Sequence, residues 1–96
     1  INMEENAIPL SDPVQAVCEL LGYDPLYLAC EGRVVAAIAA DEADDAVQEL
    51  RLSGVAPDAA VIGTVGEKKG AVTLTTGLGG QRLIDELEDD PLPRIC

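Results

Sequence analysis

The chain has 96 residues, of which 48% are hydrophobic, and this is the size of one small domain. Six Lys and Arg residues stand against 18 Asp and Glu residues, so the net charge is −12. We therefore expect no binding to nucleic acid or to an anionic membrane surface, since both would repel the chain. The chain contains no His, which excludes Ser-His-Asp and Cys-His catalysis and His-ligated zinc within it.

The cysteines and the first residues predict a cytoplasmic protein. The odd number of cysteines and their spacing fit neither a disulfide framework nor a zinc motif, so we expect free thiols and no metal; they are Cys18, Cys30 and Cys96. Residues 1–10 lack the charged and apolar regions of a secretory signal, and no apolar run reaches the roughly 20 residues of a membrane span. Because the sequence begins with Ile1 rather than Met, we expect a piece of a longer chain.

The chain begins with a predicted strand and a predicted helix. The strand is expected over Ile1–Leu10. Asp12 is suited to cap the helix, and Pro13 suits the first helical position, where its missing N–H costs nothing. Gly22 is a typical C-terminal stop. One apolar stripe is formed at helical spacing by Val14, Val17, Cys18 and Leu21, which makes Cys18 a core residue.

Two apolar runs follow, Leu26–Cys30 and Val34–Ala40, and they predict a β-hairpin with Gly32 at a positive φ in its turn. A second helix is expected over Glu42–Leu52, with Asp41 as its cap. The acidic residues around Asp41 lie in its first turn, where the helix dipole favours carboxylates.

The remaining apolar runs predict strands over Ala59–Val65 and Ala71–Thr76, joined as a hairpin by the turn at Gly66–Gly70. The segment Gln81–Leu87 is either a last strand or a helical turn, because its period decides for neither. The last residues, Glu88–Cys96, are acidic and contain prolines, and we expect a flexible tail.

The predicted fold class is α+β, in the order βαββαββ, related to ferredoxin-like folds. We expect residues 1–87 to form a partial α+β domain and residues 88–96 to form a flexible tail. The stretch Gly77–Gly80 would offer N–H groups to a phosphate, but it lacks the Walker and dinucleotide patterns, so a flexible connector is favoured. From the residues alone, Cys96 is a tethered or incidental thiol and Glu31 an ordinary turn carboxylate.

The sequence resembles the HypE family of hydrogenase maturation factors, which belongs to the aminoimidazole ribonucleotide synthetase-like superfamily. Leu92–Cys96 is similar to the C-terminal signature of that family. Glu19–Gly32 resembles its segment E-x-L-G-x-D-P-L-Y-x-A-N-E-G, and Gly79–Arg82 resembles its segment G-G-x-R. Ile62–Val65 also fits, so the resemblance runs over nearly the whole chain.

The resemblance implies an ATP-dependent S-carboxamide dehydratase. In this family HypF carbamoylates the terminal cysteine, ATP activates the carboxamide, and dehydration gives a thiocyanate whose cyanide passes to the iron held by HypC and HypD. Cys96 then matches the carrier thiol and Glu31 the family's proposed base. Recognition of the tail would involve Pro93, Arg94 and Ile95. The full-length protein would be a homodimer.

Some residues depart from the family pattern. Cys30 stands where the family usually has Asn, and Pro91 replaces a usual Gln or similar residue before Leu92. The N-terminal domain, expected to bind most of the ATP and Mg, is absent from this sequence, as is the first part of the C-terminal domain. We therefore expect this piece alone to bind no cofactor and to be inactive.

Two other classes of function remain open. The chain would alternatively be a protein-interaction module whose tail is a recognition peptide with an inert thiol. A regulatory module that binds a small ligand is the third possibility, although no ligand motif supports it. Cys96 discriminates between the first two, because a carrier needs its sulfur and a recognition peptide would tolerate Ser.

Overall fold

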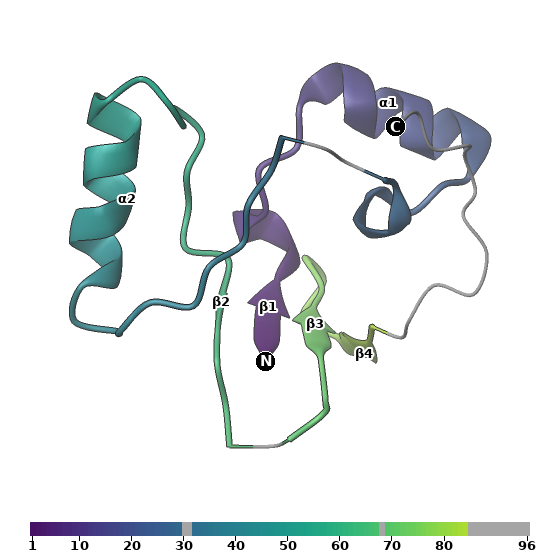
Figure 1. Ribbon diagram of the computed structural model, residues 1–96. Coiled ribbons are helices and arrows are strands. Elements are labelled where there is room, and N and C mark those ends of the chain that lie inside the picture. Colours follow the sequence, from purple (N-terminus) through teal and green to yellow (C-terminus); the bar gives the residue numbers. More distant parts are fainter. Residues whose placement is uncertain (30–31, 68, 85–96) are drawn as a thin grey trace. The chain divides into compact units, whose positions relative to one another are not determined.

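The computed structural model describes residues 1–29, 32–67 and 69–84 (Figure 1). Contacts divide the chain into two compact units. Among the described residues, the first unit holds 1–9, 36–67 and 69–84, and the second holds 10–29 and 32–35. Helices and a mixed sheet occur together, so the predicted α+β class is confirmed.

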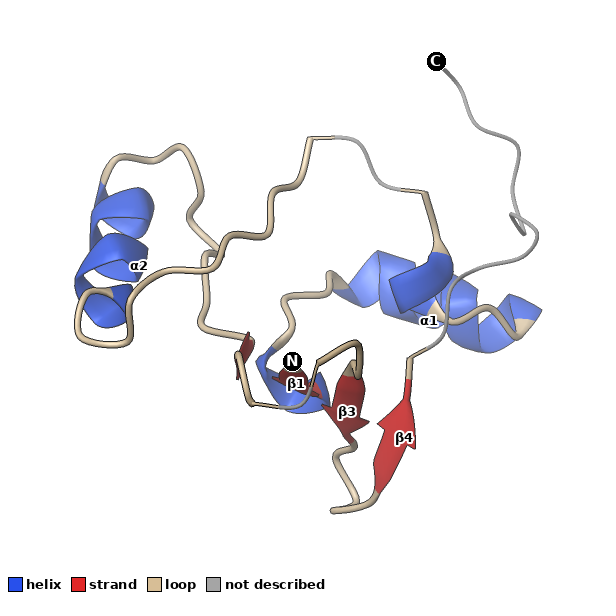
Figure 2. Cartoon of the chain, turned by 60° about the horizontal axis from the view of Figure 1, so that its bottom comes forward, coloured by secondary structure: helices blue, strands red, loops and turns tan. Residues whose placement is uncertain are grey.

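The first unit is built on a four-stranded sheet with the order β2-β1-β3-β4. Its strands, all short, are β1 (Asn2–Glu4), β2 (Gly63–Thr64), β3 (Thr73–Thr75) and β4 (Gln81–Leu83). β1 pairs antiparallel with β2 and parallel with β3, and β3 pairs antiparallel with β4 (Figure 2). The ambiguous segment after residue 80 is therefore a strand at its start.

The predicted hairpin that joins Ala59–Val65 to Ala71–Thr76 is wrong. β1 lies between β2 and β3, so these two strands pair with β1 and not with each other. Strands next to a common neighbour lie about 10 Å apart, which the connection over 65–72 easily spans. Close pairing also depends on Gly63, because a Cβ there would clash with the carbonyl oxygen of Asn2.

The register separates the two faces of the sheet. Met3, Leu74 and Arg82 are aligned across β1, β3 and β4, and Leu74 is fully buried. The opposite face is polar in β3, where Thr73 and Thr75 flank Leu74. The first predicted strand is shorter than expected, because a 3-10 turn, η1 (Glu5–Ala7), ends it.

The second unit contains the helix α1 (Asp12–Leu21). Ser11 is its N-cap without a side-chain hydrogen bond, so the predicted capping by Asp12 is wrong, although Pro13 does lie in the first turn. Gly22 adopts the left-handed conformation at φ 73°, as predicted for the stop. Of the predicted stripe only Cys18 is buried.

The predicted hairpin over 26–30 and 34–40 is wrong for the residues that the structure describes. A 3-10 turn, η2 (Pro25–Tyr27), replaces the start of the first strand, and residues 34–40 form no strand. Val34 is 90% exposed and the rest of residues 34–40 are exposed as well, so the apolar run that suggested a strand is not buried by the described residues. Local turn chemistry at Asp24 and Pro25 outweighs β propensity here, since an isolated hairpin is marginally stable.

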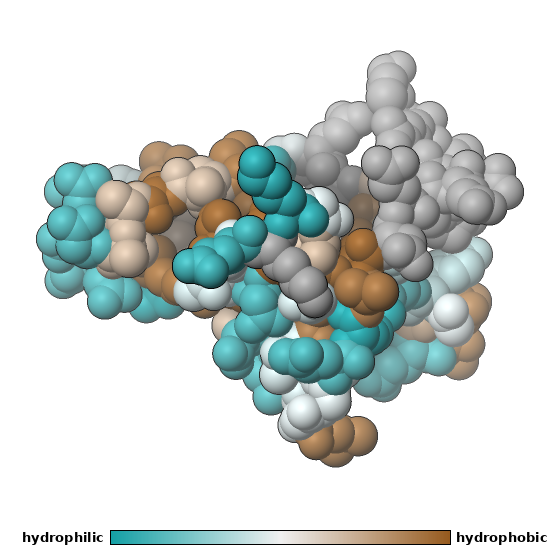
Figure 3. Space-filling model, turned by 90° about the horizontal axis from the view of Figure 1, so that it is seen from below, coloured by the Kyte–Doolittle hydropathy of each residue, from teal (hydrophilic) through white to brown (hydrophobic). Residues whose placement is uncertain are grey.

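The helix α2 (Ala43–Leu52) belongs to the first unit and confirms the second predicted helix. Its N-cap is Glu42, without a side-chain hydrogen bond, so the predicted cap by Asp41 is wrong. Arg51 donates from Nε to the carbonyl oxygen of Ala59 at 2.7 Å and ties the helix to the following segment. Figure 3 shows apolar and hydrophilic side chains side by side over this helix, at the left of the view.

Candidate functional site

The residues predicted to do chemistry lie outside the described part of the chain. This holds for Cys96, for Glu31 and for the tail residues Pro93, Arg94 and Ile95. It also holds for Cys30, which departs from the family pattern. The structure describes the chain up to Ala29 and again from Gly32, and these segments lead toward the candidate site and away from it.

The approach to Glu31 begins where α1 ends. Gly22 turns the chain in the left-handed region, and the N–H of Tyr23 donates to the carbonyl oxygen of Cys18 at 2.9 Å. Nothing lies within 4 Å of a Cβ built on Gly22, so a larger side chain would have room there. The positive φ of this residue is what favours glycine. Cys18 is 3% exposed and serves packing, as predicted.

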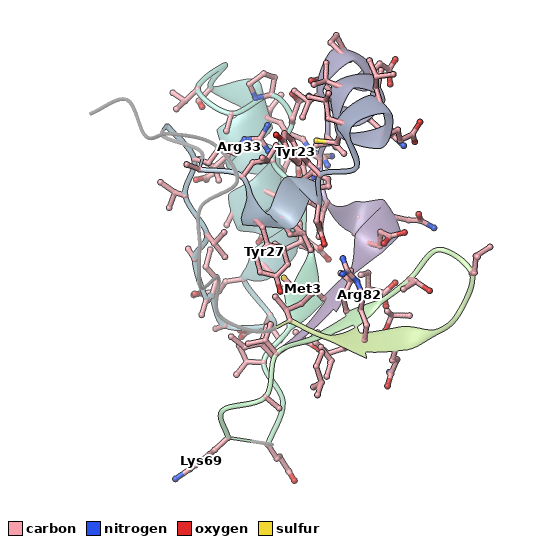
Figure 4. The ribbon with its side chains drawn as sticks, turned by 90° about the vertical axis from the view of Figure 1, so that its right-hand side faces the viewer. Met3, Tyr23, Tyr27, Arg33, Lys69 and Arg82 are labelled. Atoms are coloured by element: carbon pink, nitrogen blue, oxygen red, sulfur yellow. The ribbon has the colours of Figure 1, made fainter. Side chains whose placement is uncertain are left out.

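The turn η2 follows directly and is closed by Asp24. Its Oδ1 accepts the N–H of Leu26 at 3.0 Å, and its carbonyl oxygen accepts the N–H of Tyr27 at 3.0 Å. Pro25 occupies the first position of the turn, where it has no N–H to donate. The turn packs against α1 within the same unit. Tyr23 and Tyr27 are labelled in Figure 4.

Gly32 and Arg33 continue the chain on the other side of Glu31. Gly32 has a φ of 83°, as the sequence predicted for a turn residue. Arg33 adds a guanidinium two residues beyond Glu31, in the same unit as Tyr23 and Tyr27 (Figure 4). The candidate base is therefore flanked by a hydrogen-bonded turn and by a glycine in the left-handed region.

The glycine-rich stretch before β4 is a hydrogen-bonded turn and not a loose connector. The N–H of Gly77 donates to Oε1 of Glu5 at 3.3 Å, and the N–H of Gly80 donates to Oγ1 of Thr76 at 3.1 Å. Gly79 donates to the carbonyl oxygen of Thr76. These N–H groups are engaged within the chain, so the turn offers no phosphate cradle made from them.

An open groove lies within the first unit, between α2 and the segment before β2. Its apolar side chains include Val47 and Val61, and its polar ones include Asp44 and Arg51. Among residues 1–29, 32–67 and 69–84, no group of three His, Cys, Asp or Glu residues is placed to hold a metal ion. No helix in that part of the chain is long and apolar enough to cross a bilayer.

Comparison with known proteins shows to which family the chain belongs. Residues 1–75 match the family model of the AIR synthase related protein, C-terminal domain. The chain therefore belongs to this family, in agreement with its α+β fold.

The particular relatives are HypE proteins. The chain is 41% identical over 97 residues to carbamoyl dehydratase HypE of Azotobacter vinelandii, covering 100% of this chain and 28% of that protein. It is 44% identical over 95 residues to carbamoyl dehydratase HypE of Rhodobacter capsulatus, covering 98% of this chain and 28% of that protein. The chain thus spans little more than a quarter of these relatives.

Solved structures of HypE are similar along the same region. Escherichia coli HypE, a hydrogenase maturation protein, matches with a TM-score of 0.89 and 41% identity, covering 99% of this chain and 29% of that one. HypE in complex with ATP matches at 0.81 and 37%, covering 94% and 29%. A chain of the HypE–HypF complex matches at 0.83 and 34%, covering 90% and 28%.

Sequence reasoning did not assign a role to Asp24 apart from the family resemblance. The signal was present, because an Asp side chain commonly accepts the backbone N–H two residues later, and Pro25 favours the turn. The hydroxyls of Thr73 and Thr75, which both donate to Oδ1 of Asn2, were not predictable, because more than 70 residues separate them from Asn2.

Proposed function

We propose that this chain is the part of a longer S-carboxamide dehydratase that carries the acceptor thiol, Cys96. The observation that carries the proposal is the similarity to carbamoyl dehydratase HypE, which extends over the whole chain at 41% identity. The terminal Pro93-Arg94-Ile95-Cys96 lies within that similarity. We assign residues 1–87 to the folded part and 88–96 to the tail that presents the thiol.

The proposed chemistry uses two groups of this chain. The thiol of Cys96 loses its proton, and its sulfur forms a bond to the carbamoyl carbon as the bond from that carbon to the leaving group of the donor breaks, which gives a thiocarboxamide. Glu31 then accepts one proton from the amide nitrogen, and the second N–H proton passes to solvent, as the C–O bond breaks and the C≡N bond of the thiocyanate forms. ATP bound by the longer protein would supply a phosphoryl group to the amide oxygen, which would then leave as phosphate. Delivery of the C≡N group to the iron as cyanide would break its bond to the sulfur and leave Cys96 as a thiolate, with two electrons supplied by a reductant outside this chain.

The residues in the described part of the chain do not fit an ATP–Mg site. The N–H groups of Gly77 and Gly80 are engaged by Glu5 and Thr76, and no three carboxylates converge there. A HypE structure in complex with ATP is among the similar structures, and this supports ATP as co-substrate of the longer protein. We assign ATP and Mg to the remainder of that protein.

The partners follow from the same proposal. The similarity to HypE in a HypE–HypF complex supports HypF as the donor of the carbamoyl group. The cyanide would pass to the iron held by HypC and HypD, in the cytoplasm. The full-length protein would form a homodimer. The strongly acidic chain, with a net charge of −12, would favour a partner with a basic surface.

The decisive experiment is mass spectrometry of the chain after incubation with HypF, carbamoyl phosphate and ATP. We expect a carbamoyl adduct that peptide mapping locates on Cys96 and that is lost in Cys96→Ala. Cys18 and Cys30 serve as internal controls, since both stay unmodified. An adduct on neither this chain nor a full-length protein with the same tail would contradict the proposal. If the native chain forms no adduct and Cys96→Ser binds the partner as well as the native chain does, the result would favour a protein-interaction module with an inert thiol.

The isolated chain is proposed to be inactive in dehydration. It covers 28% of its HypE relatives, and among its described residues no three His, Cys, Asp or Glu side chains are placed to hold a metal ion. We expect no ATP hydrolysis above background, measured as phosphate release with and without the carbamoylated tail. Phosphate release that is lost in Glu31→Gln would contradict this expectation.

A further inference from the structure

The outer edge of β2, in the first unit, has no partner strand. On its inner side β2 pairs with β1, where the N–H of Glu4 donates to the carbonyl oxygen of Ile62 at 2.8 Å. In an antiparallel pair, the backbone groups of successive residues point alternately toward the partner strand and away from it. Those of Val61, Gly63 and Val65 therefore point away from β1. Among the described residues, none bonds to these outward groups.

This edge lacks the features that keep exposed edges from pairing. Edges that stay in water are usually protected by charged side chains, prolines or bulges. The run Ala59–Val65 contains no charged residue and no proline, and Val61 and Val65 are 47% and 69% exposed. β4, at the other end of the sheet order, does carry a charge, that of Arg82. The sequence of the β2 edge is therefore suited to a covered position.

A second apolar run of the first unit also has no partner in the described part of the chain. Residues 36–40 are Ala-Ala-Ile-Ala-Ala, and all are exposed, Ile38 by 48%. They lead into α2, after which the chain returns to β2 (Figure 1). No backbone hydrogen bond joins 36–40 to β2 or to another described strand. Two such runs, connected by a helix and not paired with each other, are typical of a split βαβ unit, in which a further strand lies between them.

The groove beside α2 offers room for the side chains of such a strand. It is open, has a volume of about 580 Å³, and is lined on its apolar side by Val47, Ala60 and Val61. Val61 also belongs to the free edge, and a strand paired there would direct alternate side chains to the same face. The chain covers only 28% of its HypE relatives, so most of the longer protein is available to supply the strand.

We propose that the free edge of β2 is a docking surface for a β-strand from the part of the longer protein that lies outside this chain. The strand bonds through its main chain to Gly63 and Val65, and its apolar side chains enter the groove beside α2. The inference rests on the part of the proposed function that makes this chain a piece of a longer protein. It does not depend on the chemistry at Cys96.

The first test compares amide exchange in the 96-residue chain with that in a fusion of this chain behind the remaining part of its Escherichia coli HypE relative. We expect the amides of Gly63 and Val65 to exchange about tenfold more slowly in the fusion, as for one added hydrogen bond. The amide of Glu4, which is bonded in both proteins, is the reference. If all three amides slow equally, or if none does, the proposal is overturned.

The second test removes one outward donor. Val65→Pro deletes the N–H at this edge, where proline is tolerated as long as that N–H faces water, and Val65→Ala is the control that keeps it. In the 96-residue chain, the two variants should have the same urea midpoint. In the fusion, Val65→Pro should accelerate exchange at Gly63 by about tenfold relative to Val65→Ala, because a hydrogen bond to the docked strand is lost. Equal exchange in the two fusion variants would overturn the proposal.

The remaining outcomes identify other occupants and separate the two proposals. Slow exchange of Gly63 and Val65 already in the 96-residue chain overturns the inference. A dimer mass by light scattering would then identify a second copy on the edge, and a monomer mass would identify another segment of the same chain. Carbamoylation of Cys96 in the fusion is measured separately by mass. A fusion that protects Gly63 and Val65 but accepts no carbamoyl group would support the docked strand and contradict the proposed function.

Discussion

The sheet of the first unit and the α1–η2 segment of the second are held together by different kinds of contact. In the sheet, β1 pairs with β2 and β3, which lie about 60 to 70 residues further along the chain. In the α1–η2 segment, the hydrogen bonds around Gly22 and Asp24 join residues that are only two to five positions apart. The sheet therefore depends on the whole intervening chain, whereas the turn depends on its own few residues.

This difference predicts that the two regions lose structure separately. Substitutions in the sheet should accelerate amide exchange over β1 and β3 and leave η2 unaffected, and substitutions in the turn should do the opposite. Each prediction below is checked by urea unfolding of the 96-residue chain and by amide exchange in both regions.

The largest effect is expected at Leu74, the fully buried side chain of β3. Leu74→Ala removes buried apolar contacts and leaves a cavity, which costs about 2–5 kcal/mol of the free energy of unfolding. The matched control is Leu78→Ala, because Leu78 is 102% exposed and should change little. Equal losses in the two variants would show that β3 does not carry the core.

A loss of up to about 3 kcal/mol is expected for Gly63→Ala. The added Cβ would meet the backbone of Asn2 and Met3, so β2 must move away from β1. Gly66→Ala is the control, because nothing lies within 4 Å of its Cβ and its φ is not positive. Fast exchange at Glu4, whose N–H donates to Ile62, should accompany only the first variant.

The same contrast explains how much of the fold could be predicted from the sequence. The bounds of α1 and α2 and the stop at Gly22 depend on local spacing and were predicted to within a few residues. The insertion of β1 between β2 and β3 depends on pairing across the chain, which an apolar run does not specify. The hairpin predicted after Pro25 is wrong, because the exposed apolar run that begins at Val34 pairs with no strand in the described part of the chain.

The candidate site divides in the same way. Gly32 at positive φ was predicted, because glycine marks such turns locally. The closing of η2 by Asp24 was predictable from the Asp-Pro pair but was not predicted from it. Cys96 and Glu31 came from the family resemblance, and their roles remain predictions, since no geometry tests them.

A smaller effect is expected at Gly22, within the α1–η2 segment. Gly22→Ala places a Cβ in the left-handed conformation, at a cost of roughly 1–2 kcal/mol. Gly22→Asn should cost less, because Asn tolerates this region. Exchange should accelerate at Tyr23 and Leu26 and stay unchanged in β1 and β3. Acceleration in the sheet as well would contradict the separation of the two regions.

The smallest effect is expected for a single hydroxyl in the sheet. Oγ1 of Thr73 donates to Oδ1 of Asn2 at 2.8 Å, and Thr75 does so at 3.4 Å. Thr73→Val keeps the β-branched shape and removes the donor, which costs about 1 kcal/mol. Thr75→Val, the matched control, should cost less because its contact is longer and weaker. Because both variants preserve the backbone pairs of β1 and β3, exchange there should rise uniformly and only slightly. A larger loss for Thr75→Val than for Thr73→Val would show that the Asn2 amide is held by β3 in another way.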